Sequence, residues 1–424
     1  MEQTQNPYNP LRPLKVAYLC DQSPLNGNLY SGGNARIHES LQKHIGKVQV
    51  LSNSWHLAEP LRRLVEALPE RYTIRLRWRL HLLLAPIIAM GVKRELKKTR
   101  PDVLFTAYSF HSLLGVQPGR DVLTVYTSDA SPTVYRESEI GASFKPLFSL
   151  GKLLNPAILW AEKRVFRKAD LVLWPSDWQE EGARQTYGLE SSRARMVPWG
   201  ANIPWVDAPP QRVAPKDGQT VELLFIGRDW WAKGGPTAFQ TLQQLRAEGV
   251  NARLTVIGCK PPEAFAGDAM EVYPQLDKAV PEDLTTFKVA LERAHFFLLP
   301  SFESFGFAFC EAAAYAIPAL CLRVGGVPVK DGVNGFALPI GSEAGDFAAK
   351  IRAVLNAPGL YETLSQSARR EYEERLNWDA WGQEVARLIR EQRARLGLDA
   401  PAGAEDPMGD AEAHKEEQRD HRKG

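Results

Sequence analysis

Short apolar runs alternate along the chain with segments of helical periodicity. In the first half, runs with strand character fall at residues 15–20, 48–51, 103–105, 122–126, 171–174 and 196–197. Helix-length segments separate them, beginning with residues 35–44 after a polar, glycine-containing loop. Strands that alternate with helices imply a parallel sheet covered on both faces. The pattern therefore predicts the α/β class.

The same pattern restarts after a proline-rich break at residues 202–220. Apolar runs then recur at residues 221–226, 254–257, 296–299 and 319–322, with helical segments at 233–248, 282–294, 305–316, 346–355, 360–374 and 378–395. We therefore expect a domain at residues 1–205, a linker at 206–219 and a second domain at 220–397. The final helix can also pack back on the first domain. Residues 398–424 lack apolar periodicity and predict a disordered tail.

The composition agrees with two packed domains. The chain has 424 residues, 44% apolar and 24% charged, which excludes collagen-like, disulfide-dense and wholly disordered proteins. The four cysteines form no Cys-x-x-Cys pair and lie in or beside apolar runs, as is typical of reduced, buried thiols. The first residues do not resemble a signal peptide, and no apolar run reaches the ~18 residues of a spanning helix. We expect a cytoplasmic protein, either free or peripheral at the inner face of the membrane.

Charge is unevenly distributed. The net charge is +2, but residues 61–100 hold 11 basic and 3 acidic side chains. Arg75, Arg77, Arg79 and His81 alternate there with apolar residues, whereas other apolar positions fit a helical stripe, so the period does not decide between strand and helix. Three interpretations remain open: a solvated helix face, a contact with anionic lipid, or a site for a phosphorylated acceptor. Nucleic acid is disfavoured, because no recognised binding module accompanies the charge.

A turn that follows a buried strand carries the most informative chemistry. Glu303 lies in this turn, and the backbone amides of Ser304, Phe305 and Gly306 can face an anion at the start of the next helix. Glu311 follows Glu303 by eight residues, which is ~12 Å along a helix. The two carboxylates could hold hydroxyls at the ends of a ligand with a central diphosphate. Alternatively, the helix merely begins after a glutamate.

Two other strand-to-helix turns are candidates for phosphate binding. Arg228 and Lys233 flank a glycine turn, where cations suit a pyrophosphate leaving group. Gly32 and Gly33 allow close approach of a ligand but do not form the Gly-x-Gly-x-x-Gly fingerprint, which disfavours a dehydrogenase. The sequence has no Asp-x-Asp element, so we expect no metal.

These residues together resemble retaining glycosyltransferases of the GT-B fold, close to glycosyltransferase family 4. The resemblance covers most of residues 15–390. Its most specific part is the Glu-x7-Glu element of "FESFGFAFCEAAAYAIPAL", followed by Gly325-Gly326 and "DGVNG". Supporting segments are "FIGRDWWAKGG", "ADLVLWPSDW" and "VPWGAN".

The resemblance implies two Rossmann-like domains that face each other across a cleft, with the acceptor on the N-terminal side. It implies that Glu311 binds the ribose of a UDP- or GDP-linked sugar. The diphosphate would be held by Arg228 and Lys233, with Gly32 and Gly33 near it. Glu303 would orient the donor sugar, and the amides of residues 304–306 would complete the cradle. No cofactor is implied.

Many relatives also place a histidine near the reaction centre in the N-terminal domain. This chain offers His111 and Asp129, and the sequence does not decide which of them faces the acceptor. The implied activity is transfer of a hexosyl group to an acceptor hydroxyl with retention, in the synthesis of cell-surface glycans, glycolipids or small glycosides. The alternatives are a non-catalytic sugar-nucleotide-binding protein and a sugar-nucleotide epimerase with the same double fold.

Overall fold

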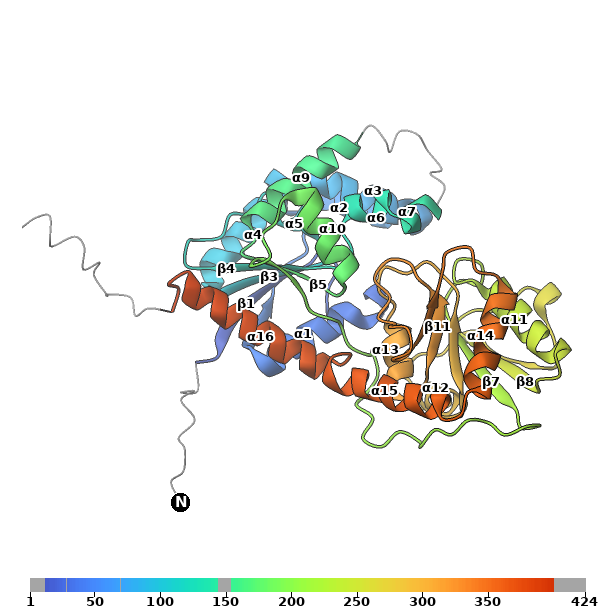
Figure 1. The fold of residues 1–424 in the computed structure, drawn as a ribbon. Helices are drawn as coiled ribbons and strands as arrows, with labels where there is room; N and C mark the ends of the chain where they lie inside the picture. The colour runs from blue at the N-terminus through green and yellow to red at the C-terminus, as the bar shows by residue number, and fades with distance from the viewer. Residues whose placement is uncertain (1–11, 28, 69, 144–153, 400–424) are drawn as a thin grey trace, which may run out of the picture.

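The computed structural model describes residues 12–27, 29–68, 70–143 and 154–399, and these residues form two α/β domains (Figure 1). The predicted tail lies outside the described residues from residue 400 onward. Leu398 and Asp399 are described, and both bond to Arg393 of the last helix.

The first domain is built on a parallel sheet with the strand order β2-β1-β3-β4-β5-β6. The strands are β1 Leu14–Leu19, β2 Gly46–Val50, β3 Val103–Ala107, β4 Leu123–Thr127, β5 Leu171–Trp174 and β6 Ala194–Met196. The helices are α1 Gly33–His44, α2 Glu59–Glu66, α3 Glu70–Leu83, α4 Ala85–Thr99, α5 Phe110–Leu113, α6 Pro132–Glu137, α7 Glu139–Ser143, α9 Asn155–Lys168 and α10 Asp177–Tyr187. The central strands are buried on both faces, which explains why they appear in the sequence as continuous apolar runs.

The second domain repeats this architecture with the order β12-β11-β10-β7-β8-β9, again parallel. Its strands are β7 Val221–Ile226, β8 Ala252–Ile257, β9 Met270–Tyr273, β10 Phe296–Leu299, β11 Ala319–Leu322 and β12 Gly335–Leu338. Its helices are α11 Gly235–Ala247, α12 Pro281–Arg293, α13 Phe307–Ala314, α14 Ala344–Asn356 and α15 Leu360–Glu374. The prediction of an α/β protein with two Rossmann-like units is confirmed.

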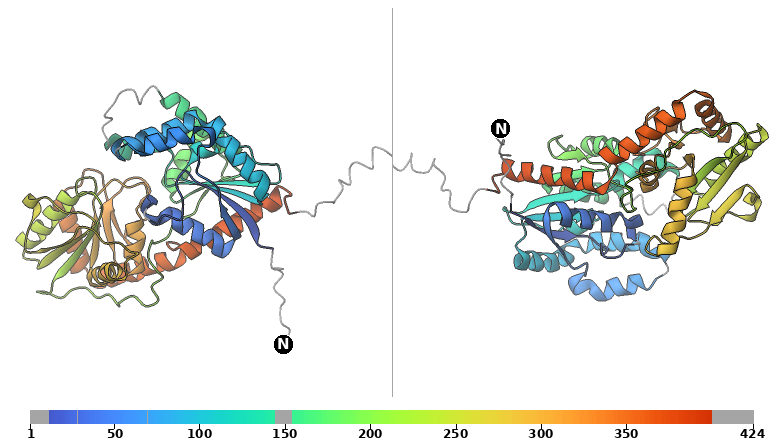
Figure 2. Two further views of the ribbon diagram at one scale, coloured as in Figure 1. Left: turned by 180° about the vertical axis from the view of Figure 1, so that it is seen from behind. Right: turned by 90° about the horizontal axis from the view of Figure 1, so that it is seen from below.

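The last helix, α16 Trp378–Arg395, crosses back to the first domain and packs on α1. Figure 2 shows this red helix running along the first domain from behind and from below. Trp381 is 1% exposed and meets the ring of Phe105 at 6.2 Å between centroids. The Arg393 guanidinium donates a hydrogen bond to the carbonyl of Asp102. Both ends of the described chain therefore belong to the first domain.

The basic segment forms helices, which resolves the ambiguity of its period. Arg77 of α3 is buried and donates to the carbonyl oxygen of Asp21, so it does not belong to a solvated face. Arg62 of α2 is paired with Glu59 and Glu66. The exposed cations of this segment are concentrated on α4. Side chains of residues 70–76, including Arg75, lie outside the described part.

The four cysteines are free and buried, as predicted. Burial raises the pKa of the Cys20 thiol to about 12 and that of Cys259 to about 11, which keeps both protonated. Among the helices in the described ranges, none is long and apolar enough to span a bilayer.

Candidate active site

The turn between β10 and α13 forms the centre of the candidate site. Glu303 is 8% exposed, and its Oε1 accepts hydrogen bonds from the Ser301 hydroxyl at 2.7 Å and from Lys233 Nζ at 2.5 Å. Gly306 caps α13 with a φ of 89°, a conformation that favours glycine. Glu303 is thus held at the entrance to a helix N-terminus by a cation from another loop.

The second carboxylate, Glu311, lies within α13 and is 2% exposed. Its Oε1 forms an ion pair with Lys278 Nζ, and Lys278 comes from the loop between β9 and α12. That ammonium also lies 4.3 Å from the centroid of the Phe287 ring. Sequence reasoning missed Lys278, because no motif marks it and only the fold brings it to Glu311.

The loop that carries Lys278 is fixed by two carboxylates. Asp283 accepts a hydrogen bond from the backbone N–H of Asp277 at 2.8 Å, and Asp277 accepts one from that of Ala279 at 2.9 Å. These bonds on either side of Lys278 restrict the backbone from which its side chain extends. The position of the ammonium over Glu311 is therefore supported by local structure.

The turn between β7 and α11 supplies the predicted cations. Lys233 packs against the turn, since a Cβ at Gly227 would lie 2.7 Å from its Cγ. Arg228 is exposed and forms no ion pair or hydrogen bond with any described residue. Asp229 accepts from the backbone N–H of Ala232 at 2.8 Å and thus stabilises the turn. The structure brings Lys233, but not Arg228, into contact with a predicted carboxylate.

The loop with Gly32 and Gly33 belongs to the first domain, at the start of α1. A Cβ added to Gly33 would lie 2.5 Å from Tyr108 Oη and 2.6 Å from Cζ of Phe307, which is the first residue of α13. Gly33 therefore permits close packing between the two domains. Gly32 caps α1 with a φ of 85°, and the Asn202 amide donates to the neighbouring Ser31 carbonyl at 2.7 Å.

Contacts across the interface surround the Glu303 turn. The Ser304 hydroxyl donates to Asp129 Oδ2 at 2.7 Å, so Asp129 faces the C-terminal domain. A Cβ at Gly325 would lie 2.5 Å from Ile140 of the first domain and 2.2 Å from the Glu303 carbonyl.

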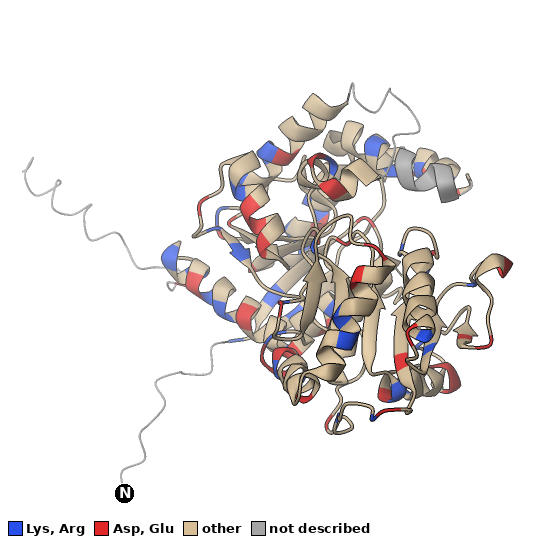
Figure 3. Ribbon diagram, turned by 45° about the vertical axis from the view of Figure 1, so that its right-hand side comes forward, with Lys and Arg blue, Asp and Glu red and all other residues tan. Residues whose placement is uncertain are grey.

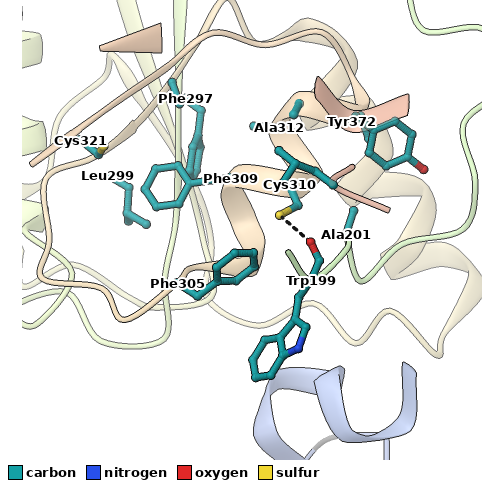
Figure 4. Packing of buried hydrophobic residues seen from close by; sticks show 14 of the residues in the cluster. Trp199, Ala201, Phe297, Leu299, Phe305, Phe309, Cys310, Ala312, Cys321 and Tyr372 are labelled. Atoms are coloured by element: carbon teal, nitrogen blue, oxygen red, sulfur yellow. Dashed lines mark hydrogen bonds between the residues drawn. The ribbon is translucent and has the colours of Figure 1, made fainter. Parts of the chain in front are cut away.

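Aromatic residues fill the space beside this turn. The rings of Trp199 and Phe307 stack at 5.4 Å, and Phe305 meets Trp199 edge-on at 5.8 Å. Figure 4 shows Trp199 beside Phe305 and α13, with the Cys310 thiol directed at the Trp199 carbonyl. The Phe305 side chain is therefore part of the core, and its backbone alone could contact a ligand.

His111 lies apart from this turn, in a buried cluster at the carboxyl ends of β1 and β3. Its Nε2 is 3.5 Å from Asp21 Oδ2, and its ring meets that of His81 at 4.6 Å between centroids. Burial alone would raise the pKa of Asp21, but the nearby His111 ring, the charge of Arg77 and the hydrogen bond from Ser109 lower it below its usual range. Asp129 and not His111 therefore meets the Glu303 turn.

The geometry combines two buried carboxylates, each with one oxygen held by a lysine, and a helix N-terminus that can receive negative charge. Such a set can bind a polyhydroxylated, phosphorylated ligand. In the described ranges, no three His, Cys, Asp or Glu side chains are grouped so that they could hold a metal ion.

Comparison with known proteins identifies the family. The profile "Glycosyltransferase Family 4" matches residues 35–203, and "Glycosyl transferases group 1" matches residues 220–357. A D-inositol 3-phosphate glycosyltransferase of Catenulispora acidiphila is 25% identical over 55% of this chain and 61% of its own length. The chain thus spans about three fifths of that curated relative.

Solved structures show the same fold. Sucrose-phosphate synthase from Thermosynechococcus elongatus aligns with a TM-score of 0.64 at 18% identity, over 91% of this chain and all of its own. The Anabaena protein HepE, solved with UDP-glucose, aligns with a TM-score of 0.53 at 15% identity, over 89% of this chain and all of its own. The fold is therefore GT-B, and the two consecutive profile matches show that the chain belongs to the family 4, group 1 glycosyltransferases.

Proposed function

We propose that this protein transfers a hexosyl group from a UDP- or GDP-linked sugar to an acceptor hydroxyl, with retention of the anomeric configuration. The observation that carries the proposal is the arrangement of Glu303 in the turn before α13 and Glu311 within α13, each buried and paired with a lysine from a different loop. Family membership supports it, as does the HepE structure with bound UDP-glucose. The product belongs to a glycan, a glycolipid or a small glycoside.

On this proposal Glu311 hydrogen-bonds the ribose, and Lys233 and Arg228 bind the diphosphate. The bond between the sugar C1 and the phosphate oxygen breaks through an oxocarbenium-like transition state, and the acceptor oxygen bonds to C1 on the same face. The departing phosphate takes the acceptor proton. Negative charge grows on this leaving group, so fixed cations and the amides of residues 304–306 stabilise the transition state more than the ground state.

Glu303 orients the sugar and stabilises positive charge at C1 without forming a covalent bond. Its Oε1 is already occupied by Lys233 and Ser301, and Oε2 has no hydrogen-bond partner among the described residues. Oε2 is therefore the oxygen that would face the sugar. We further propose that no metal takes part and that the protein acts in the cytoplasm, where its four thiols stay reduced.

Donor binding is tested first by thermal shift with UDP-, GDP- and ADP-sugars. A ligand at ~100 times its dissociation constant stabilises the native state by about 2.7 kcal/mol. We expect a UDP- or GDP-sugar to raise the melting temperature, with or without EDTA. If no nucleotide-sugar raises it, the donor assignment is wrong, and if EDTA abolishes the shift, metal independence is wrong.

Donor turnover then tests the site residues. Glu303→Gln and Lys233→Met are expected to lower the hydrolysis or transfer rate by about 10²- to 10³-fold, because each removes a group that stabilises developing charge. Asp229→Asn is the matched control in the same turn and should retain the rate. Unchanged turnover in both site variants would refute the assignment. Release of an epimerised nucleotide-sugar in place of a glycoside would indicate an epimerase.

A further inference from the structure

The outer faces of α4 and α9 carry cations without carboxylate partners. Lys93, Arg94, Lys97 and Lys98 are exposed on α4, and Arg164 and Arg167 are exposed on α9. None of these six pairs with a carboxylate of the described chain. The acidic residues of the same helices are engaged elsewhere, because Glu95 accepts from the Ser52 backbone and Glu162 is buried against Thr133. We call the six cations and the helix faces that bear them the α4–α9 surface.

Exposed apolar side chains precede the cations on both helices. Ile87 and Met90 are 36% and 44% exposed on the outer side of α4, and Trp160 is 59% exposed on α9. The Arg164 guanidinium lies 5.7 Å from the centroid of the Trp160 ring. On each helix, residues spaced three or four apart form one stripe that is apolar in its N-terminal half and basic in its C-terminal half. The same order on both helices forms one surface with an apolar end and a cationic end.

The two helices cover the same face of the first sheet. The short helix α5 packs against both of them, so they are separated by only one turn of helix. Lys168, at the end of α9, donates to the carbonyls of Val116 and Leu114 beyond α5. Burial, together with the charges of Arg164 and Lys93, lowers the pKa of Lys168 to about 8. The cations of α4 and α9 are therefore close enough to interact.

The direction of the helices orients this surface. Both α4 and α9 lead directly into parallel strands, β3 and β5, so their C-terminal ends lie at the edge of the sheet where strands begin. At the opposite edge, residues 21, 108–111 and 129 follow the ends of β1, β3 and β4, and Asp129 there bonds to Ser304 of the candidate site, so we call this edge the cleft edge. The apolar ends of both stripes therefore point toward the cleft edge. A shallow depression of about 400 Å³ along α9 is lined by Trp160 and the basic residues that follow it.

Other charged helices differ from this surface. In Figure 3, blue and red positions alternate along α16, where Arg387 pairs with both Glu384 and Glu391. A solvated helix face usually carries such mixed charge. Unpaired cations beside an exposed tryptophan and aliphatic side chains instead match the two components of a bilayer surface, anionic head groups and the acyl boundary.

We propose that the α4–α9 surface docks this protein on a membrane rich in anionic phospholipid, with the cleft edge of the first domain next to the bilayer. Nucleic acid would account for the cations but not for the exposed apolar residues that accompany them on both helices. The surface includes α9, which lies outside the basic segment of residues 61–100, and excludes the buried Arg77. It is independent of the proposed sugar transfer.

The test is vesicle co-sedimentation of the full chain. Vesicles of phosphatidylcholine with 30% phosphatidylglycerol are expected to bind the protein, and pure phosphatidylcholine vesicles are not. A variant with Lys93, Lys97, Arg164 and Arg167 changed to Ser is expected to bind at least about 100-fold more weakly, since each cation near an anionic surface contributes roughly fivefold. Trp160→Ala should also weaken binding, but less.

The matched control changes Lys47, Lys216, Arg253 and Lys260 to Ser, which alters the net charge by the same amount at exposed positions elsewhere. It should bind as the wild type does, and both variants should keep the wild-type circular dichroism and donor hydrolysis. Equal loss in both variants would overturn the proposal, because binding would then follow net charge alone. It would also fail if the wild type bound a single-stranded RNA but not the anionic vesicles.

Discussion

At the scale of single residues, the candidate site consists of lysine–glutamate pairs that join separate loops. Lys233 and Lys278 each bind one oxygen of a buried glutamate. A buried carboxylate without a partner is costly, so the lysines stabilise the site in the absence of a ligand. A bound polyol would then find both carboxylates already fixed in orientation.

The Lys278–Glu311 pair predicts a specific pattern of stability. Lys278→Met leaves a carboxylate that is 2% exposed without its cation, and we expect a loss of about 1–3 kcal/mol in the free energy of unfolding. Adding Glu311→Gln removes the unpaired charge and should restore much of this loss. Urea unfolding of the wild type and the three variants gives the coupling energy. Additive effects of the two substitutions would contradict the pairing.

At the scale of elements, the strands were the most predictable feature. Central strands such as β3 and β10 are buried on both faces, so a continuous apolar run was enough to locate them. The edge strands β9 and β12 were not predicted: β9 is only half buried and mixes polar with apolar residues, and β12 has four residues and begins with a glycine. The sequence of the α3 segment fits both the helical and the strand period, so it does not predict which element forms. In the structure the segment is a helix, and packing buries Arg77.

Only part of the candidate site could be predicted from the sequence. Glu303, Glu311 and Lys233 stand in a recognisable pattern at strand-to-helix turns, so local sequence was enough to select them. Lys278 was not predicted, because it reaches the site from another loop and carries no local signal. Asp129 was a candidate from the sequence, but only the fold shows that it bonds to Ser304. The sequence predicts close approach of a ligand at Gly33, and in the structure Gly33 also lies against Phe307.

His295 links two neighbouring strands and predicts a pH dependence. The Nδ1 atom of His295 accepts a hydrogen bond from the backbone N–H of Glu222 at 3.0 Å. The backbone N–H of His295 donates one to the carbonyl oxygen of Glu222 at 2.7 Å, and these two bonds join β10 to β7. Burial, with a smaller effect of Arg212, lowers the pKa of His295 to about 4. Because the unfolded chain takes up this proton near pH 6.5, stability is unaffected above that pH and falls as the pH decreases toward 4.

Between pH 7 and pH 5, protonation of this residue in the unfolded chain should lower the free energy of unfolding of the wild type by about 2 kcal/mol. His295→Asn keeps an acceptor for the Glu222 N–H but does not titrate. The difference in unfolding free energy between wild type and variant, measured by urea denaturation at both pH values, should therefore change by that amount. A difference independent of pH would show that His295 is not held neutral.

At the scale of the whole molecule, the two domains share one apolar cluster. Trp199 lies where the chain leaves the first domain, and it stacks on Phe307 of the second. The Ser304–Asp129 hydrogen bond and the Gly33–Phe307 contact lie on the same interface. The described structure is thus a closed arrangement, in which the Glu303 turn already touches the first domain.

Gly33→Ala tests how far closure depends on this packing. The added methyl group would overlap Tyr108 and Phe307, so the domains must separate or shift, and overpacking of this kind costs about 1–3 kcal/mol. We expect a larger radius of gyration by small-angle X-ray scattering. Gly119→Ala, where no atom lies within 4 Å of the added Cβ, is the control. An unchanged radius in Gly33→Ala would indicate that the contact does not determine closure.

The return of α16 to the first domain has a consequence for biosynthesis. Trp381, Val385 and Ile389 cover a face of the first domain, yet they are synthesised after the entire second domain. The first domain is discontinuous in sequence, so it cannot finish folding while the ribosome is still translating the second. Until residue 395 has left the exit tunnel, the surfaces of α1 and Phe105 that receive α16 stay open to solvent and to chaperones. A ribosome that stalls after β12 would therefore release a chain with two incomplete domains.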